Sequence, residues 1–216
     1  MNKHYRIVAW CAGVLLAGGM AAAQAQAAGS GQAGQAPANR LAVRGKIEQV
    51  TDTTLLIKAR NGKDVTVALP ANVAVRAVSL AKLGDIKPDS FIGTAATPQP
   101  DGTLKALEVH VFAASLRGSG EGNRPWMGSD GKTGQMTNGT VGSLVGTNGT
   151  TMKVKYKDGE KTVVVPPDVP IVYMEPGDRS LLKTGAPVLV FPTKNADGSL
   201  TAATVIAGKD GTIPPM

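Results

Sequence analysis

Few side chains of this chain could bind a ligand or take part in a reaction, and the most distinctive of them are Arg124 and Trp126. The two residues flank Pro125 in a glycine-rich stretch that has no hydrophobic periodicity. An exposed indole is a flat platform for a sugar ring or a peptide, and an arginine beside it could orient an anionic group. Alternatively, Trp126 fills a seam between two domains and Arg124 forms a structural bond close by. The sequence leaves both interpretations open and makes both residues candidates for ligand binding.

A second candidate is a row of lysines, Lys153, Lys155 and Lys157, which are spaced two residues apart. In a strand this spacing places the three side chains on one face, opposite Met152 and Val154. One interpretation is a solvated outer face, which also protects a sheet edge from aggregation. The other is a docking strip for an anionic envelope polymer or an acidic partner, which makes the row a candidate ligand-binding surface.

No catalytic or metal-binding constellation is evident in the sequence. His110 is the only histidine after His4, and strict alternation along its strand would place it with Glu108 on a solvated face. A zinc site needs several converging ligands, and a second histidine or a cysteine is missing. Ser119 lies between two glycines, which is not the G-x-S-x-G spacing of a nucleophile elbow. The sequence therefore predicts no catalytic residue, no metal and no cofactor.

The N-terminus has the pattern of a signal peptide, predicted to cover residues 1–27. A basic start precedes an apolar run, and the following Ala-Gln repeats offer cleavage sites after Ala25 or Ala27. No later stretch approaches the length of a bilayer span, so the mature protein is expected to be periplasmic or secreted, with no membrane span after cleavage. The only cysteine, Cys11, lies in the signal, so the mature chain is expected to have no disulfide.

The rest of the chain consists of two copies of one unit, predicted at residues 41–112 and 139–208. The Asn-Gly dipeptide at 61–62 is a strong hairpin signal, and Asp-Gly occupies the corresponding position in the second copy, at 158–159. Other turns and strands recur at a similar offset, which makes a chance repeat improbable. The remaining predicted segments are a disordered leader (28–40), a Gly-rich joint containing Trp126 (113–138) and a C-terminal tail (209–216).

Each unit is predicted to contain three strands, a short crossover and two further strands. In the first unit, the crossover is expected to include one helical turn within residues 78–89. This order is that of an OB-fold, a five-stranded and partly open barrel. The sequence therefore predicts an all-β fold of two tandem, small, five-stranded OB-like β-barrels, with an SH3-like barrel as the alternative.

Two local features of the predicted strands can be compared directly with the structure. Gly45 and its counterpart Gly139 are expected at a bulge or bend, since glycine inside a strand often marks one. On the last strand of the first unit, alternation places Leu107, Val109 and Val111 on the face toward the core.

The joint LRGSGEGNRPW, the stretch TMKVKYKDGEKTVVVPPDVPIV and the closing ATVIAGKDG resemble exported bacterial proteins of domain of unknown function (DUF) family 5666. The resemblance runs from about residue 41 to the C-terminus and implies a small β-barrel module in a secreted or periplasmic protein with no assigned activity. Some relatives carry a metal-transporter permease label, which this sequence argues against because a permease needs several membrane spans. Relatives often have GHRPWD at the joint, where this chain has Asn123 and Met127 in place of the His and the Asp.

The sequence thus predicts an exported, non-enzymatic binding or interaction module of the cell envelope, without identifying its ligand or its oligomeric state. A formal net charge of +7 favours anionic partners, so an anionic polymer, a glycan or an envelope protein is expected. An aromatic content of 4% argues against binding of single-stranded nucleic acid. The alternatives are a structural spacer and an envelope hydrolase acting through carboxylates such as Glu121, Asp130 or Glu175.

Overall fold

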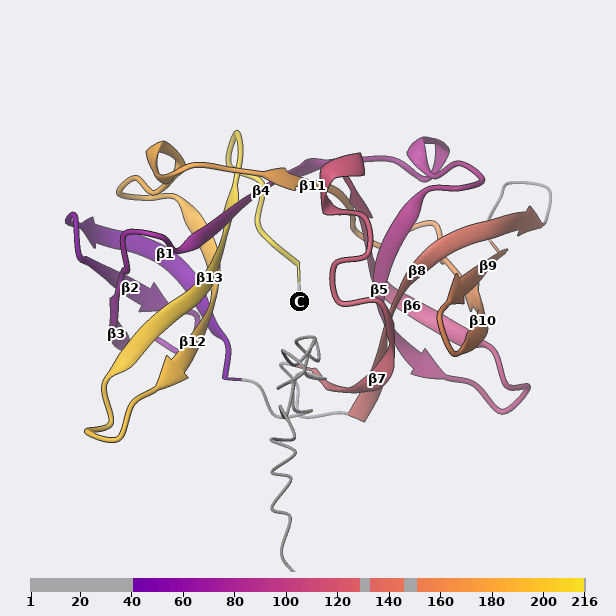
Figure 1. Cartoon of the computed structure of the whole chain (residues 1–216), viewed down its shortest axis with the longest axis horizontal. Helices are drawn as coiled ribbons and strands as arrows, with labels where there is room; N and C mark the ends of the chain where they lie inside the picture. The colour runs from indigo at the N-terminus through magenta and orange to yellow at the C-terminus, as the bar shows by residue number, and fades with distance from the viewer. Residues whose placement is uncertain (1–40, 129–132, 146–150, 216) are drawn as a thin grey trace, which may run out of the picture. The chain divides into compact units, whose positions relative to one another are not determined.

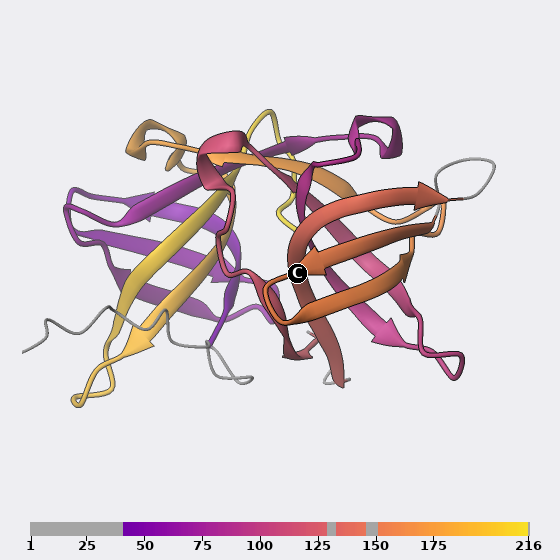
Figure 2. The ribbon, with the colours of Figure 1, turned by 45° about the vertical axis from the view of Figure 1, so that its right-hand side comes forward.

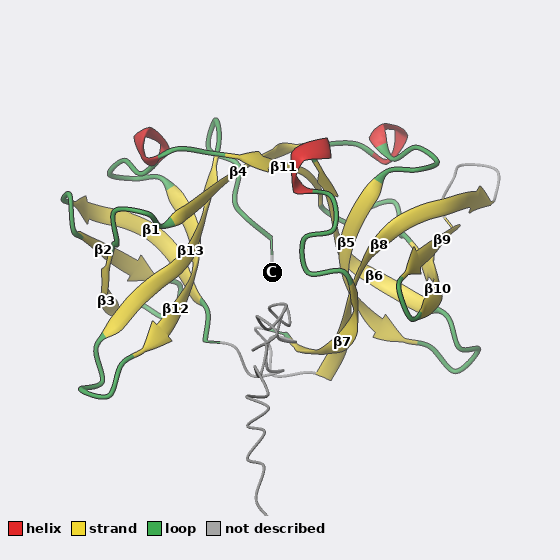
Figure 3. Cartoon of the chain, in the orientation of Figure 1, coloured by secondary structure: helices red, strands yellow, loops and turns green. Residues whose placement is uncertain are grey.

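The computed structural model describes residues 41–128, 133–145 and 151–215; the predicted signal peptide and leader therefore lie outside the described residues. Within these ranges the chain is all-β, as the sequence predicts, with thirteen strands, three short 3-10 helices and no α-helix (Figure 3). The described ranges contain no helix with the length and apolar character needed to cross a membrane.

The same order of elements occurs twice along the chain, on either side of a joint (Figure 1). The first copy contains β1 (Val43–Val50), β2 (Thr54–Ala59), β3 (Asp64–Ala68), β4 (Ala74–Leu80), η1 (Leu83–Asp85), β5 (Phe91–Pro98) and β6 (Leu104–Phe112). The joint contains η2 (Ala114–Leu116) and β7 (Gly122–Met127). The second copy contains β8 (Thr133–Val145), β9 (Thr151–Tyr156), β10 (Gly159–Val164), β11 (Ile171–Pro176), η3 (Arg179–Leu181), β12 (Pro187–Lys194) and β13 (Leu200–Gly208).

Five strands close into a mixed barrel, in the order β8-β9-β10-β6-β5. All neighbours are antiparallel except β10 and β6, which are parallel and pair Val163 with Leu104. The interior is filled by apolar side chains from every strand, including Ile92, Met152 and Val154, which are fully buried. Alternating apolar residues on short strands thus supply this core, as the binary pattern of the sequence requires.

A second group of strands is built in the same way. β1, β2 and β3 form an antiparallel meander, β12 pairs with β1, and β13 pairs with β12. β13 also meets β3 through one parallel pair, Thr201 with Ala68. Side chains such as Ile47, Leu55 and Val205 fill the space that these strands enclose. This group has its own core, distinct from that of the closed barrel.

The strand pairing differs from the tandem arrangement expected from the sequence, because the two copies exchange their last two strands. β5 and β6 of the first copy pair with strands of the second copy, and β12 and β13 pair with strands of the first (Figures 1 and 2). β4 and β11 run antiparallel to each other and carry the chain between the two groups. A third apolar cluster, which includes Val78, Leu189 and Ile206, packs where the two groups meet. The exchange therefore gives the groups a shared interior.

Two segments that were expected as crossover or loop contain strands. Within 78–89 the expected helical turn is present as η1, but β4 precedes it and pairs with β11 and β13. The Gly-rich joint has no hydrophobic periodicity, yet β7 forms a ladder with β8 from Gly122 to Met127. β4 pairs with strands far along the chain, whereas β7 and β8 form a local hairpin in which Met127 pairs with Thr133.

The last strand of the first copy contains an irregularity that changes which side chains face the core. Ala95 pairs with Glu108 but Ala96 pairs with Ala106, so Leu107 is an extra, unpaired residue. Such a bulge shifts the alternation by one position. Val109 and Val111 are buried in the barrel as expected, whereas Leu107 is 46% exposed. The prediction for Leu107 is therefore wrong.

Candidate functional site

A cavity of about 420 Å³ lies between the joint and the outer faces of both strand groups. Its lining side chains come from β1, β4, β6, β7, β8, β11, β12 and β13. They are of two kinds, arginines and large apolar residues, with few other polar groups. The volume falls within the range of about 300 to 1,000 Å³ that is typical of small-molecule sites.

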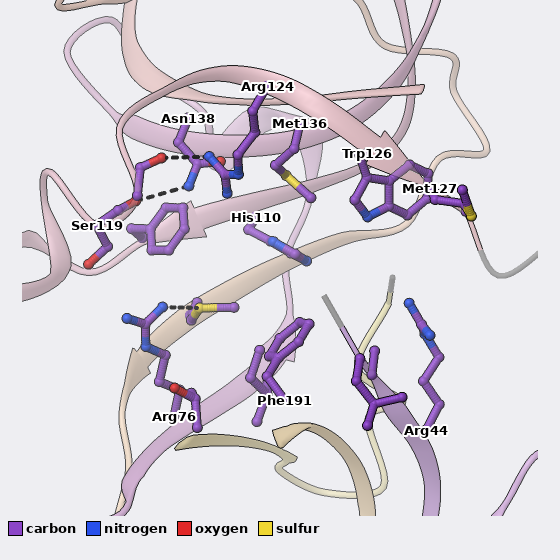
Figure 4. A pocket seen from close by; sticks show the side chains of 18 of the residues that line it. Arg44, Arg76, His110, Ser119, Arg124, Trp126, Met127, Met136, Asn138 and Phe191 are labelled. Carbon is purple, nitrogen blue, oxygen red and sulfur yellow. Dashed lines mark hydrogen bonds between the residues drawn. The ribbon is translucent and has the colours of Figure 1, made fainter. Parts of the chain in front are cut away.

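Arg124 and Trp126, the pair singled out by the sequence, both line this cavity (Figure 4). The two residues are two positions apart on β7, so their side chains lie on the same face of the strand. In the ladder with β8, Trp126 lies opposite Gly134. A Cβ on Gly134 would lie 3.2 Å from Cε3 of Trp126, so the indole packs directly over this glycine. Trp126 is half-buried, which leaves part of the indole available to a ligand.

Two side chains donate hydrogen bonds to backbone carbonyl oxygens of the loop before β7. Arg124 Nη1 donates to the carbonyl oxygen of Gly120 at 2.9 Å. Asn138 Nδ2 donates to the carbonyl oxygen of Ser119 at 2.9 Å (Figure 4). Arg124 therefore has the structural role considered from the sequence, and it also lines the cavity. Ser119 lies at the cavity wall as a loop residue and has no elbow geometry.

Two further arginines line the cavity that sequence reasoning did not single out, Arg44 from β1 and Arg76 from β4. Arg76 Nη1 lies 3.8 Å from the sulfur of Met174. Burial, followed by the charge of Arg60, lowers the pKa of Arg44, while the charge of Glu108 acts in the opposite direction. The positive charge of Arg44 is therefore partly removed from water, where its interactions are stronger.

His110 is buried at the cavity wall, although the sequence places it with Glu108 on a solvated face. Both side chains are about 3% exposed, because the outer face of β6 lies against the other strand group rather than water. Burial, and then the charge of Arg76, lowers the pKa of His110 to about 4. The imidazole is therefore neutral at neutral pH. Its Nε2 lies 3.7 Å from Glu108 Oε1 and has no hydrogen-bond partner among the described residues.

The lysine row lies away from this cavity. Lys153 and Lys155 are exposed on the outer face of β9, and neither they nor Lys157 line the cavity. Lys153 Nζ lies 3.3 Å from Glu160 Oε1 on the neighbouring strand β10. The two groups of predicted ligand-binding residues therefore belong to different surfaces of the molecule.

Reversing the charge of Lys153, Lys155 and Lys157 to glutamate together is expected to abolish retention on a polyanion column at low salt. The substitutions remove a compact row of positive charge, and surface charges of this kind attract a polyanion to the protein. The control replaces three scattered exposed lysines, Lys63, Lys87 and Lys194, with glutamate. It should retain part of the binding, and equal loss in both variants would show that net charge alone is responsible.

Glu121 and Glu175, two of the carboxylates considered for hydrolysis, are not among the described residues that line the cavity. Glu175 Oε1 accepts a hydrogen bond from Lys209 Nζ at 2.9 Å, and Glu121 is exposed before β7. Asp130 lies outside the described residues. No group of three or more His, Cys, Asp or Glu side chains in the described ranges is arranged to hold a metal ion.

Comparisons with family models, with curated proteins and with solved structures found no match to this chain. The resemblance to DUF family 5666 therefore stays a prediction from the sequence. Any functional interpretation must come from the geometry of the cavity itself.

Proposed function

We propose that this protein is an exported, non-enzymatic binding protein of the cell envelope, and that its ligand site is the cavity at the joint. The observation that carries the proposal is the cavity itself, which combines Arg124 and Trp126 with aromatic and apolar side chains. A mostly apolar cavity with a few converging polar groups is the usual form of a small-molecule site. The predicted signal peptide supports export to the periplasm or the medium.

We further infer that the closed barrel is OB-like. Its support is the three-stranded meander of β8, β9 and β10, closed by a parallel pair between β10 and β6. The strands of the other group pair in the corresponding order. An SH3-like barrel remains the alternative description. Because a fold by itself does not assign a function, the proposal rests on the cavity.

The two other functions have less support from the described residues. A hydrolase needs a pair of acids converging on a substrate, and none of the described residues that line the cavity is acidic. A structural spacer needs no concave surface, whereas the described residues form a cavity of about 420 Å³ that three arginines line.

The proposal is tested by blocking the cavity. Thr204 lines it from β13, so Thr204→Phe should fill part of the space, whereas Ala203→Phe places the same side chain at an exposed position of that strand. All proteins would be screened by thermal shift against glycans, peptides, organic anions and divalent metals. At about 100 times its dissociation constant, a ligand adds roughly 2.7 kcal/mol of stability.

We expect at least one compound to stabilise the unmodified protein and the Ala203→Phe variant but not the Thr204→Phe variant. A screen in which no compound stabilises the protein would refute the proposal. The same conclusion would follow if every stabilising compound acted equally on both variants, because the ligand would then bind elsewhere.

A further inference from the structure

The side chains around the cavity carry a clear excess of positive charge. Arg44, Arg76 and Arg124 come from three different strands and face one space, into which His110 points (Figure 4). None of the described residues that line the cavity is acidic, and the nearby buried Glu108 supplies a negative charge. Three guanidinium groups thus face one carboxylate in a setting where burial strengthens charge interactions.

Much of the remaining lining is apolar. It includes Phe112, Phe191 and Met136, together with the half-buried indole of Trp126. Phe112 and Met136 are less than 10% exposed even without a ligand. A purely inorganic ion would leave this wall uncovered, whereas a ligand with an apolar body would cover it and gain about 25 cal/mol for each Å² removed from water.

Two buried polar atoms at the wall have no hydrogen-bond partner among the described residues, His110 Nε2 and Asn138 Oδ1. His110 is 3% exposed and Asn138 is 6% exposed, and both line the cavity. An unsatisfied buried polar atom costs about 1 to 3 kcal/mol, so folded proteins rarely keep one without a use. An oxyanion in the cavity would accept a hydrogen bond from His110 in the tautomer that carries its proton on Nε2, whereas Asn138 Oδ1 is itself an acceptor and needs a donor.

We infer that the cavity binds an organic oxyanion with an apolar body. The charged head group lies among the three arginines, whose planar guanidinium groups match the geometry of a carboxylate or a phosphate. The apolar body lies against Phe112, Phe191 and Trp126. This inference rests on the proposed function, because it names the ligand class of the same cavity.

The experiment compares carboxylates with their neutral amides by isothermal titration calorimetry on the full chain. The probes are octanoate with octanamide and 2-naphthoate with 2-naphthamide, which share size and shape within each pair and differ in charge. Inorganic phosphate serves as an anion without an apolar body. We expect at least one carboxylate to bind tenfold or more tightly than its amide, and also more tightly than phosphate.

Substitutions then locate the head group. Arg76→Gln and Arg124→Gln should each weaken the preferred carboxylate about tenfold, which corresponds to about 1.4 kcal/mol, and leave the amide unchanged. Lys87→Gln removes a positive charge from an exposed position outside the cavity lining and should change neither. The probe comparison on the unmodified protein needs no variant, so the inference remains testable if a variant fails to fold.

Equal affinity for carboxylate and amide would overturn the oxyanion head group, and equal affinity for phosphate and carboxylate would overturn the apolar body. The inference would also fail if none of these probes bound while a glycan or peptide still stabilised the protein in a manner sensitive to Thr204→Phe. That last result would leave the proposed function intact. Binding of no compound at all would refute both.

Discussion

Replacing Gly45 by alanine is expected to lower the free energy of unfolding by about 3 kcal/mol. A Cβ at this position would lie 2.0 Å from the carbonyl oxygen of Lys58 on the paired strand β2. Because the obstacle is backbone, it cannot rotate away, and β1 and β2 must separate to admit the methyl group. Chemical denaturation of the purified variant measures the effect.

Two further variants complete this test. Gly139→Ala in β8 would place its Cβ 2.2 Å from the carbonyl oxygen of Lys155, so a similar loss is expected. Gly84→Ala meets nothing within 4 Å and should change little. Since each group of strands contains strands of both copies, Gly45→Ala and Gly139→Ala should each shift one common unfolding transition. Two separate transitions, one of them unchanged from the unmodified protein, would contradict the strand exchange.

Acidification from about pH 7 to about pH 4 is expected to remove about 3 kcal/mol of stability through His110 alone. Burial, and then the charge of Arg76 on β4, lowers the pKa of His110 from 6.5 to about 4 in the folded protein. Glu108 also lies close to the ring, with Oε1 at 3.7 Å from Nε2. Between about pH 6.5 and pH 4 the unfolded chain therefore binds a proton that the folded protein does not, so the stability present above this window is lost as the pH falls through it.

The matched variant for this prediction is His110→Gln, which keeps a polar neutral side chain but does not titrate. Carboxylates elsewhere protonate in both proteins, so the difference between their unfolding free energies isolates the histidine. That difference should change by about 3 kcal/mol across the window. Parallel stability curves for the two proteins would show that His110 is not held neutral in the folded state.

Much of the local structure could be predicted from the sequence because it depends on nearby residues. The hairpin between β2 and β3 follows from Asn61-Gly62, and that between β9 and β10 follows from Asp158-Gly159. The bulge or bend expected at Gly45 is not there: Gly45 pairs regularly with Ala59, and the irregularity of β1 lies between Ile47 and Gln49. The physical reason for glycine is instead the close approach of the Lys58 carbonyl oxygen.

The strand exchange could not be predicted in the same way. The two copies are similar, so β3 offers much the same edge to β6 as to β13, and the pattern of apolar residues suits both pairings. Whether β3 pairs with β6 or with β13 depends on β4 and β11, which pair with each other and carry the chain from one group of strands to the other. Such long-range pairing leaves no periodic signal in either segment.

The candidate site was predictable to the same limited extent. Arg124 and Trp126 were found because they are conspicuous in a glycine-rich stretch. Arg44, Arg76 and His110 were missed because each lies on the outward face of a strand, which a single barrel would leave in water. The exchange brings the two outward faces together, and the extra residue Leu107 leaves no trace in the amino-acid pattern.

The central claim is that this protein binds a ligand in the cavity at the joint. The fluorescence emission of Trp126 tests this claim most directly. Trp10→Phe makes Trp126 the only tryptophan of the chain. Saturation with a stabilising compound should then shift or quench the emission, and should do so with Ala203→Phe but not with Thr204→Phe. Stabilisation without any change in Trp126 emission would place the ligand elsewhere and contradict the account.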